Sequence, residues 1–226
     1  MKPGILTIFG LMLAALSLMS CNDDKAGGIT DLMRTDMVTF EEESDAGTLF
    51  SMQEYEDSPM MYLMADGVHG TKLNKGERTM LGYYTKSAES PDKANIAVQF
   101  RIPVIFDSLR VAAKERIREY EINPVELKSI WRTGNFVNIN TFVQYTDKQR
   151  FIALIVDEAT LGRETVEAYF VDDILGHPGY YYRQAYISFF TGNLWAKYPD
   201  SKTLRIYIND TSYPKVKYYD ITKPKI

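Results

Sequence analysis

The stretch TLRIYIND, residues 203–210, carries the clearest strand pattern in the chain, because Leu204, Ile206 and Ile208 occupy every second position. In an extended strand these three side chains share one face, and the polar or aromatic residues between them share the other. The stretch therefore predicts a strand with one buried face, and similar strand patterns occur in the sequence around it.

Short β-branched and aromatic runs separated by turn residues fill the second half of the chain. Most are half apolar, whereas FIALIV (151–156) is continuously apolar, as expected for a central strand covered on both faces. Regularly spaced short strands of this kind are typical of a β-sandwich. The seven predicted strands span residues 125–131, 135–145, 150–157, 164–172, 183–191, 203–210 and 215–221.

The first half of the chain, from about residue 36, has the same character over a shorter length. Its apolar runs are separated by loops rich in Gly, Pro, Asp and Asn. Five strands within so short a segment are typical of a small closed barrel of the OB type. The predicted strands span residues 37–43, 47–54, 60–66, 78–86 and 95–106.

Between the two halves, SLRVAAKERIREYE (108–121) is the only stretch long enough for a sizeable helix, with Val111, Ile117 and Tyr120 loosely on one side. Pro124 would end such a helix. We therefore expect an all-β protein in which a small OB-like barrel precedes an antiparallel β-sandwich. The predicted domains are residues 36–112 for the barrel, 113–123 for a connector and 124–226 for the sandwich.

The first twenty residues have the layout of a secretory signal peptide: Lys2, an apolar run over residues 5–19, and the small residue Ser20. The next residue is Cys21, the only cysteine in the chain. LMSC, residues 18–21, resembles the bacterial lipobox, in which lipid is attached to the cysteine and cleavage makes it the first residue. We therefore expect residues 1–20 to be a lipoprotein signal peptide and Cys21 to anchor the protein to a membrane, since several acyl chains hold firmly.

Residues 21–35 combine the lipidated cysteine with a polar, glycine-bearing linker. The acidic pair Asp23-Asp24 resembles the export signal that sends lipoproteins of Bacteroides-type bacteria to the outer face of the cell, although a solvated spacer has the same composition. The predicted location is the outer membrane, with surface exposure as the finer expectation.

Composition argues against disulfide bonds, CxxC sites and a nucleic-acid partner. One cysteine cannot form a disulfide within the chain or supply a CxxC zinc or redox pattern. The net charge is −4, and loss of Lys2 with the signal peptide makes it about −5. Nucleic-acid phosphates bind clustered Lys and Arg side chains, so this acidic net charge disfavours a nucleic-acid partner.

Two segments of the second half carry a resemblance: NPVELKSIWRTGNFVNINTFVQY (123–145) and RQAYISFFTGNLWAKYPDSKTLRIYIND (183–210). They resemble the NigD-like lipoproteins of Bacteroides-type bacteria. The resemblance implies an OB-like first domain and a β-sandwich second domain, whereas no activity of that family maps onto particular residues. Only the family's name suggests a link to bacteriocin immunity.

Catalytic and metal-ligating residues are few. His69 and His177 both lie among glycines, so we expect them on loops, and no G-x-S-x-G elbow or phosphate-binding glycine motif accompanies them. In each of the adjacent pairs Asp157-Glu158 and Asp172-Asp173, the two acids point to opposite faces of a strand. They therefore cannot act together on one substrate bond. We interpret them as surface charge at strand ends and expect no catalytic residue, no metal site and no cofactor.

Aromatic residues give the remaining functional signal. GHPGYYYRQAYISFF (176–190) places Tyr180, Tyr181 and Tyr182 directly after His177 and two glycines. Exposed tyrosine suits protein or sugar contact because it offers rigid area with a polar tip. The four residues His177, Tyr180, Tyr181 and Tyr182 are therefore the candidate binding site, although sandwich core and ordinary surface tyrosine would give the same pattern.

Three hypotheses for function follow. The favoured one is a lipid-anchored envelope protein without catalytic activity that presents a binding surface, for example to a protein partner. The alternative is a carbohydrate-binding accessory lipoprotein that uses the aromatic loop around residues 177–182. The third is a glycoside hydrolase with carboxylates from separate strands, since such chemistry requires only two acids across a cleft.

Overall fold

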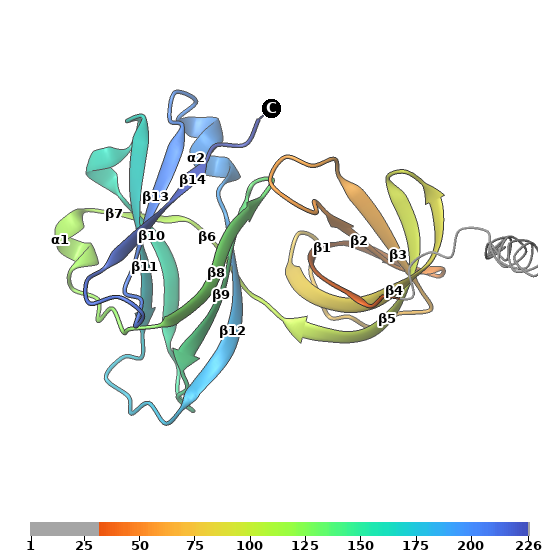
Figure 1. Ribbon diagram of the computed structural model, residues 1–226, viewed down its shortest axis with the longest axis horizontal. Coiled ribbons are helices and arrows are strands. Elements are labelled where there is room, and N and C mark those ends of the chain that lie inside the picture. The colour runs from red at the N-terminus through yellow and green to blue at the C-terminus, as the bar shows by residue number, and fades with distance from the viewer. Residues whose placement is uncertain (1–31, 226) are drawn as a thin grey trace, which may run out of the picture. The chain divides into compact units, whose positions relative to one another are not determined.

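The computed structural model describes residues 32–225, which belong to one compact unit of the chain (Figure 1). The predicted signal peptide, Cys21 and the Asp23-Asp24 pair lie outside the described residues. Strands dominate the structure, and no helix in residues 32–225 is long and apolar enough to cross a membrane.

Five strands of the first half close into a barrel in the order β1-β2-β3-β5-β4, with β4 returning to pair with β1. Neighbouring strands are antiparallel except β3 and β5, which run parallel. The predicted OB-like barrel is confirmed. Its strands are β1 (Arg34–Ser44), β2 (Gly47–Met52), β3 (Met61–Asp66), β4 (Arg78–Ser90) and β5 (Lys93–Pro103).

The barrel is held together by a core of its own. Alternate residues of the strands turn inward, and the side chains of Val38, Phe50 and Leu63 are almost fully buried there. Phe40 and Phe50 pack edge to face, with their ring centroids 6.2 Å apart. Because the five strands close on themselves, the sheet that encloses this core has no free edge.

The second half forms two sheets that enclose a larger core, and the predicted β-sandwich is confirmed. Leu204, Ile206 and Ile208, the residues that predicted the strand, are fully buried in that core. One sheet has the order β14-β13-β11-β10-β7 and the other β6-β12-β9-β8. The seven predicted strands are β8 (Glu126–Thr133), β9 (Phe136–Gln144), β10 (Phe151–Asp157), β11 (Thr165–Asp173), β12 (Tyr182–Phe190), β13 (Thr203–Ile208) and β14 (Lys217–Thr222).

Two further strands, β6 (Ile105–Ser108) and β7 (Arg110–Ala112), complete the sandwich and correct the sequence-based picture in detail. Both pair in parallel with strands far along the chain, and β11 and β13 are parallel as well, so the sheets are mixed and not purely antiparallel. The strand predicted over residues 95–106 is divided at Val104. Pro103 has no N–H to donate, which favours the end of a strand at this position.

The chain thus passes from barrel to sandwich at Val104, before the connector predicted over residues 113–123. The stretch 108–121, the only candidate for a sizeable helix, is helical only over α1 (Lys114–Ile117). The apolar side chains of Ile117, Tyr120 and Ile122 instead cover the outer face of β10 and β11. Two short elements had no sequence signal: the 3₁₀ turn η1 (Glu158–Thr160) and α2 (Gly192–Lys197), which buries Trp195.

A buried arginine joins the loop after β2 to the sandwich. Arg132 on β8 donates from one terminal nitrogen to Asp57 Oδ1 (2.7 Å), to the Glu56 carbonyl (3.3 Å) and to the Gly134 carbonyl (3.1 Å). The Gly134 N–H donates back to the Glu56 carbonyl at 2.7 Å. The hydrogen bond from Arg132 lowers the pKa of Asp57, so this carboxyl stays ionised opposite the guanidinium.

A second buried arginine, Arg78 on β4, has no carboxylate partner among the described residues. It donates to Thr39 Oγ1 (3.0 Å), to the Met37 carbonyl (3.3 Å) and, in the sandwich, to Asn138 Oδ1 (3.2 Å). Its guanidinium carbon lies 4.2 Å from the ring centroid of Phe136. Burial lowers the pKa of Arg78 to about 9. Barrel and sandwich therefore share buried polar contacts in addition to the chain connection.

Candidate functional site

The candidate binding residues lie in the loop between β11 and β12, whose shape is set by a tight turn at its start. Leu175 and Gly176 both have positive φ, at 55° and 70°, and the His177 N–H donates to the Ile174 carbonyl. Asp173 accepts the Leu175 N–H at 2.7 Å. This turn reverses the chain at the end of β11 and directs the following residues toward the end of β9.

The tyrosines of this loop are exposed, as the favoured hypothesis requires. Tyr180, Tyr181 and Tyr182 retain 60%, 57% and 44% of their accessible surface, whereas His177 is half-buried. The ring of Tyr181 stacks on that of Tyr145, with centroids 4.8 Å apart and planes inclined by 20°. No local sequence pattern pointed to Tyr145, because its stacking partner Tyr181 lies far along the chain.

Backbone contacts fix the loop on the end of β9. The Tyr145 N–H donates to the Tyr181 carbonyl at 2.6 Å, and the Tyr180 N–H donates to the Tyr145 carbonyl at 2.9 Å. At Gly179 a Cβ atom would lie only 2.4 Å from the Gln144 side chain, so glycine permits this close approach. We name the group Tyr145, Tyr180, Tyr181 and Tyr182 the tyrosine surface.

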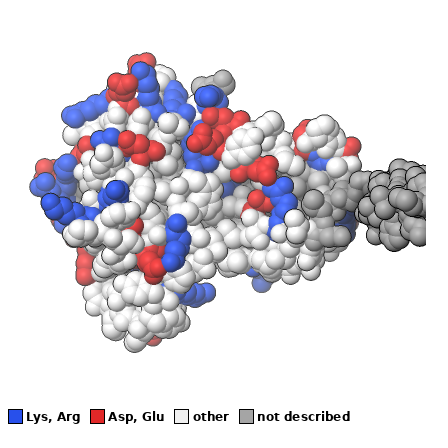
Figure 2. All heavy atoms as spheres, viewed as in Figure 1, with Lys and Arg blue, Asp and Glu red and all other residues white. Residues whose placement is uncertain are grey.

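A cavity of about 300 Å³ adjoins the tyrosine surface. Its walls are mainly apolar, from Ile105 on β6, Val143 on β9 and Ala185 on β12, and Tyr145 belongs to both the cavity and the tyrosine surface. Arg183 also lines the cavity, and its guanidinium carbon lies 6.0 Å from the Tyr145 ring centroid. Figure 2 shows a broad area without charged side chains at this end of the sandwich.

A largely buried ion pair forms part of the cavity wall, since Arg150 lines the cavity. Asp172 is fully buried and accepts two hydrogen bonds from Arg150, which also donates to the Gln144 carbonyl at 2.6 Å. Burial raises the pKa of Asp172, and the hydrogen bond from Arg150 opposes this shift only in part. Arg150 is thus committed to a structural pair, whereas Arg183 forms no ion pair within residues 32–225.

The acids interpreted above as surface charge are mostly buried, which corrects that interpretation. Asp157 accepts the Ala159 N–H and lies 3.7 Å from Lys114, and Asp173 accepts the N–H groups of Glu121 and Leu175. These acids, like Asp172, satisfy local donors in place of facing a cleft, so the geometry offers them no role in hydrolysis. Glu158 is exposed, as predicted.

The histidines lie on loops, as predicted, and the structure does not bring them together with other ligands. His69 is exposed on the loop before β4, where its Nδ1 lies 4.0 Å from Glu43. Within residues 32–225, no group of three or more His, Cys, Asp or Glu side chains is arranged to hold a metal ion.

The architecture defines the class of protein as a two-domain all-β protein, with an OB-like barrel followed by a β-sandwich. The sequence profile of the NigD-like C-terminal beta sandwich domain matches residues 110–222, half of the chain. The chain belongs to the NigD-like family. No curated protein matches it in sequence.

Solved structures from Bacteroides share the fold over most of their length. A protein of unknown function from Bacteroides vulgatus is 16% identical, with a TM-score of 0.68 over 86% of this chain and 92% of that one. A NigD-like immunity protein from Bacteroides caccae is 18% identical, with a TM-score of 0.62 over 85% and 98%. A candidate lipoprotein from Bacteroides fragilis is 8% identical, with a TM-score of 0.61 over 85% and 98%. At such identities the likeness shows the fold alone.

Proposed function

We propose that this chain is a lipid-anchored envelope protein, without catalytic activity, that binds a protein partner through the tyrosine surface. One observation carries the proposal: three consecutive exposed tyrosines lie beside an apolar cavity, and one of them stacks on a residue that lines that cavity. Tyrosine, apolar side chains and arginine are the residue types enriched where protein partners bind.

The chemistry of the partner follows from the cavity. An apolar or aromatic side chain suits walls made by Ile105, Val143 and Ala185. Arg183 at the rim has no carboxylate partner within residues 32–225 and suits an acidic residue next to that side chain. One face of Tyr181 is occupied by Tyr145, which leaves less flat ring area for a sugar than three free tyrosines would offer. A protein segment therefore fits better than a glycan.

A displayed peptide library selected on the protein tests the partner. We expect enriched peptides to carry a large apolar residue next to Asp or Glu. Their affinity should fall about tenfold or more in Tyr181→Ala, because truncation of a central aromatic contact has effects of that order. Arg183→Glu should have a similar effect, and Tyr213→Ala, at an exposed tyrosine elsewhere in the sandwich, should bind like the wild type.

Two results would contradict the protein-partner proposal. Peptides that bind Tyr181→Ala and the wild type equally would remove the tyrosine surface from the interaction. Glycans that bind the wild type and fail to bind Tyr181→Ala would favour a carbohydrate-binding accessory lipoprotein instead.

The membrane anchor and the location are supported by the LMSC motif and by the shared fold with a candidate lipoprotein from Bacteroides fragilis. Protease treatment of intact cells tests both. We expect digestion of the protein while a periplasmic marker survives, and release of Cys21→Ala from the membrane fraction, because one substitution removes every acyl chain. Protection until the outer membrane is opened would place the protein in the periplasm and refute surface export by Asp23-Asp24.

A further inference from the structure

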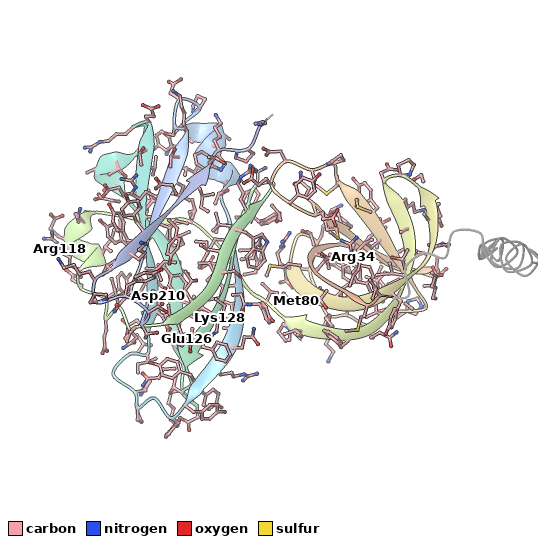
Figure 3. The ribbon with its side chains drawn as sticks, in the orientation of Figure 1. Arg34, Met80, Arg118, Glu126, Lys128 and Asp210 are labelled. Carbon is pink, nitrogen blue, oxygen red and sulfur yellow. The ribbon has the colours of Figure 1, made fainter. Side chains whose placement is uncertain are left out.

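A second cavity, of about 300 Å³, lies within the compact unit where barrel and sandwich residues meet, and it is separate from the tyrosine surface. The barrel contributes residues of β1, the segment after β2, and Met80 on β4, while the sandwich contributes residues of β8, β9 and β12. Arg34 and Met80 are labelled on the barrel strands in Figure 3. We name this cavity the junction cleft.

The barrel wall of the junction cleft presents hydrogen-bond acceptors. Arg34 donates to Asp36 Oδ2 (3.1 Å) and to Glu54 Oε1 (2.9 Å), and the Tyr83 hydroxyl donates to the same oxygen of Asp36 at 2.8 Å. These bonds hold both carboxylates in place and use one oxygen of each. Asp36 Oδ1 and Glu54 Oε2 accept no hydrogen bond from the described residues, so each remains available to a donor.

Tyr83 keeps its donor role at all ordinary pH values. Its ring is buried in the barrel core, and burial together with the nearby Asp36 carboxylate raises the pKa of its hydroxyl. The protonated Tyr83 hydroxyl donates its hydrogen to the Asp36 carboxylate, which can only accept. Arg34 and Tyr83 therefore both hold Asp36 Oδ2, and Asp36 Oδ1 stays available to a ligand donor.

The sandwich wall presents donors and aromatic rings. Gln184 donates to Asn140 Oδ1 (2.9 Å) and to the Tyr186 hydroxyl oxygen (3.0 Å). The first bond fixes the amide of Asn140 so that its NH₂ group, with two donors, has no acceptor among the described residues. The indole N–H of Trp131 likewise has no described acceptor, and the rings of Trp131 and Tyr186 line the same wall.

The structure assigns the junction cleft to a neutral oligosaccharide. A sugar hydroxyl both donates and accepts, so one ligand can donate to Asp36 and Glu54 and accept from Asn140 and Trp131. The apolar C–H face of a sugar ring can lie against Trp131 or Tyr186. This ligand is distinct from the protein partner proposed for the tyrosine surface, and Tyr186 is the one residue that lines both cavities.

Other ligand classes match the walls less well. An anion would face two carboxylates with only one arginine, which is already bonded to both of them. A purely apolar ligand would bury the free polar atoms without hydrogen bonds, and each unsatisfied atom would weaken binding. An ammonium ion suits carboxylates and rings but would leave the donors of Asn140 and Trp131 unpaired.

Binding of defined oligosaccharides to the full chain carrying Cys21→Ala tests the assignment. The probes are neutral cello-, malto-, manno- and galacto-oligosaccharides of three to six units (arrays first, calorimetry second). We expect at least one to bind, with affinity about tenfold or more weaker in Asp36→Asn and in Trp131→Ala, since each change removes ligand contacts. Asp36→Asn keeps the shape of the side chain and guards against a loss that merely reflects unfolding.

Tyr181→Ala is the matched control, because it alters the other aromatic surface of the sandwich. It should bind the oligosaccharide like the wild type even where it loses the protein partner, so the two proposals fail independently. The assignment is overturned if none of these oligosaccharides binds, if binding is unchanged in both Asp36→Asn and Trp131→Ala, or if binding depends on Tyr181 instead. Preferential binding of tetramethylammonium or of a sulfated oligosaccharide would overturn it as well.

Discussion

Arg132→Ala is expected to lower the free energy of unfolding by about 3 kcal/mol. Breaking a buried ion pair by removing one partner typically costs about 3 to 5 kcal/mol. The Arg132 side chain is 3% exposed and that of Asp57 is 22% exposed, so the lower end of that range applies. The carbonyls of Glu56 and Gly134 lose a donor in the same step.

Arg205→Ala is the matched control in the same domain. Arg205 forms two hydrogen bonds of 2.8 Å with Asp220, but the two side chains are 31% and 41% exposed. Solvent screens such a pair, so its loss should destabilise the protein much less than the loss of Arg132 does. Urea unfolding of both variants makes the comparison, and equal losses would show that burial does not strengthen the Arg132 contact.

The acid side of the stability curve gives a second readout of Arg132. Because the folded-state pKa of Asp57 is lowered, its contribution to stability is fully present above the unfolded-state pKa and is lost as pH falls through the folded-state pKa. Arg132→Ala removes the largest cause of that shift, so unfolding measured over the acidic range should depend less on pH in the variant.

Strand pattern and turn residues predicted most of the fold because those signals are local. Leu204, Ile206 and Ile208 could be assigned to one buried face from their spacing alone, and the structure buries all three. By contrast, β6 and β7 pair in parallel with β12 and β10, whose positions in space no local pattern reveals. The candidate helix over 108–121 is mostly absent for the same reason, since Ile117 and Tyr120 find their apolar partners on β10 and β11.

The sites were predictable to different degrees. Exposure of the loop around Tyr181 followed from its glycines and its run of tyrosines, whereas the stacking partner Tyr145 comes from a neighbouring strand end. Asp172 was expected at the surface because a charged side chain is seldom buried alone, and the partner that permits its burial, Arg150, lies on another strand end. The junction cleft draws its walls from both domains, so no single motif could have identified it.

Gly47→Ala should have an effect comparable with that of Arg132→Ala, and its cause is purely steric. Gly47 begins β2 with φ at +138°, a conformation that is rarely open to residues with a side chain. A Cβ atom there would lie 2.3 Å from the backbone oxygen of Ala65 on β3, and backbone cannot move aside as the end of a flexible side chain can. Strain and clash together should cost about 3 kcal/mol or more.

Gly67→Ala separates the clash from the unusual backbone angle. Gly67 also has positive φ, at +69°, but no heavy atom lies within 4 Å of a Cβ built there. The left-handed conformation alone costs an alanine about 1 to 2 kcal/mol, so this variant should be clearly more stable than Gly47→Ala. Urea unfolding measures the difference, and hydrogen exchange at the amides of Phe50 and Leu63 should locate it in the barrel core. Equal losses in the two variants would mean that β2 and β3 can separate at Gly47, and that the barrel closes less tightly there than the 2.3 Å approach implies.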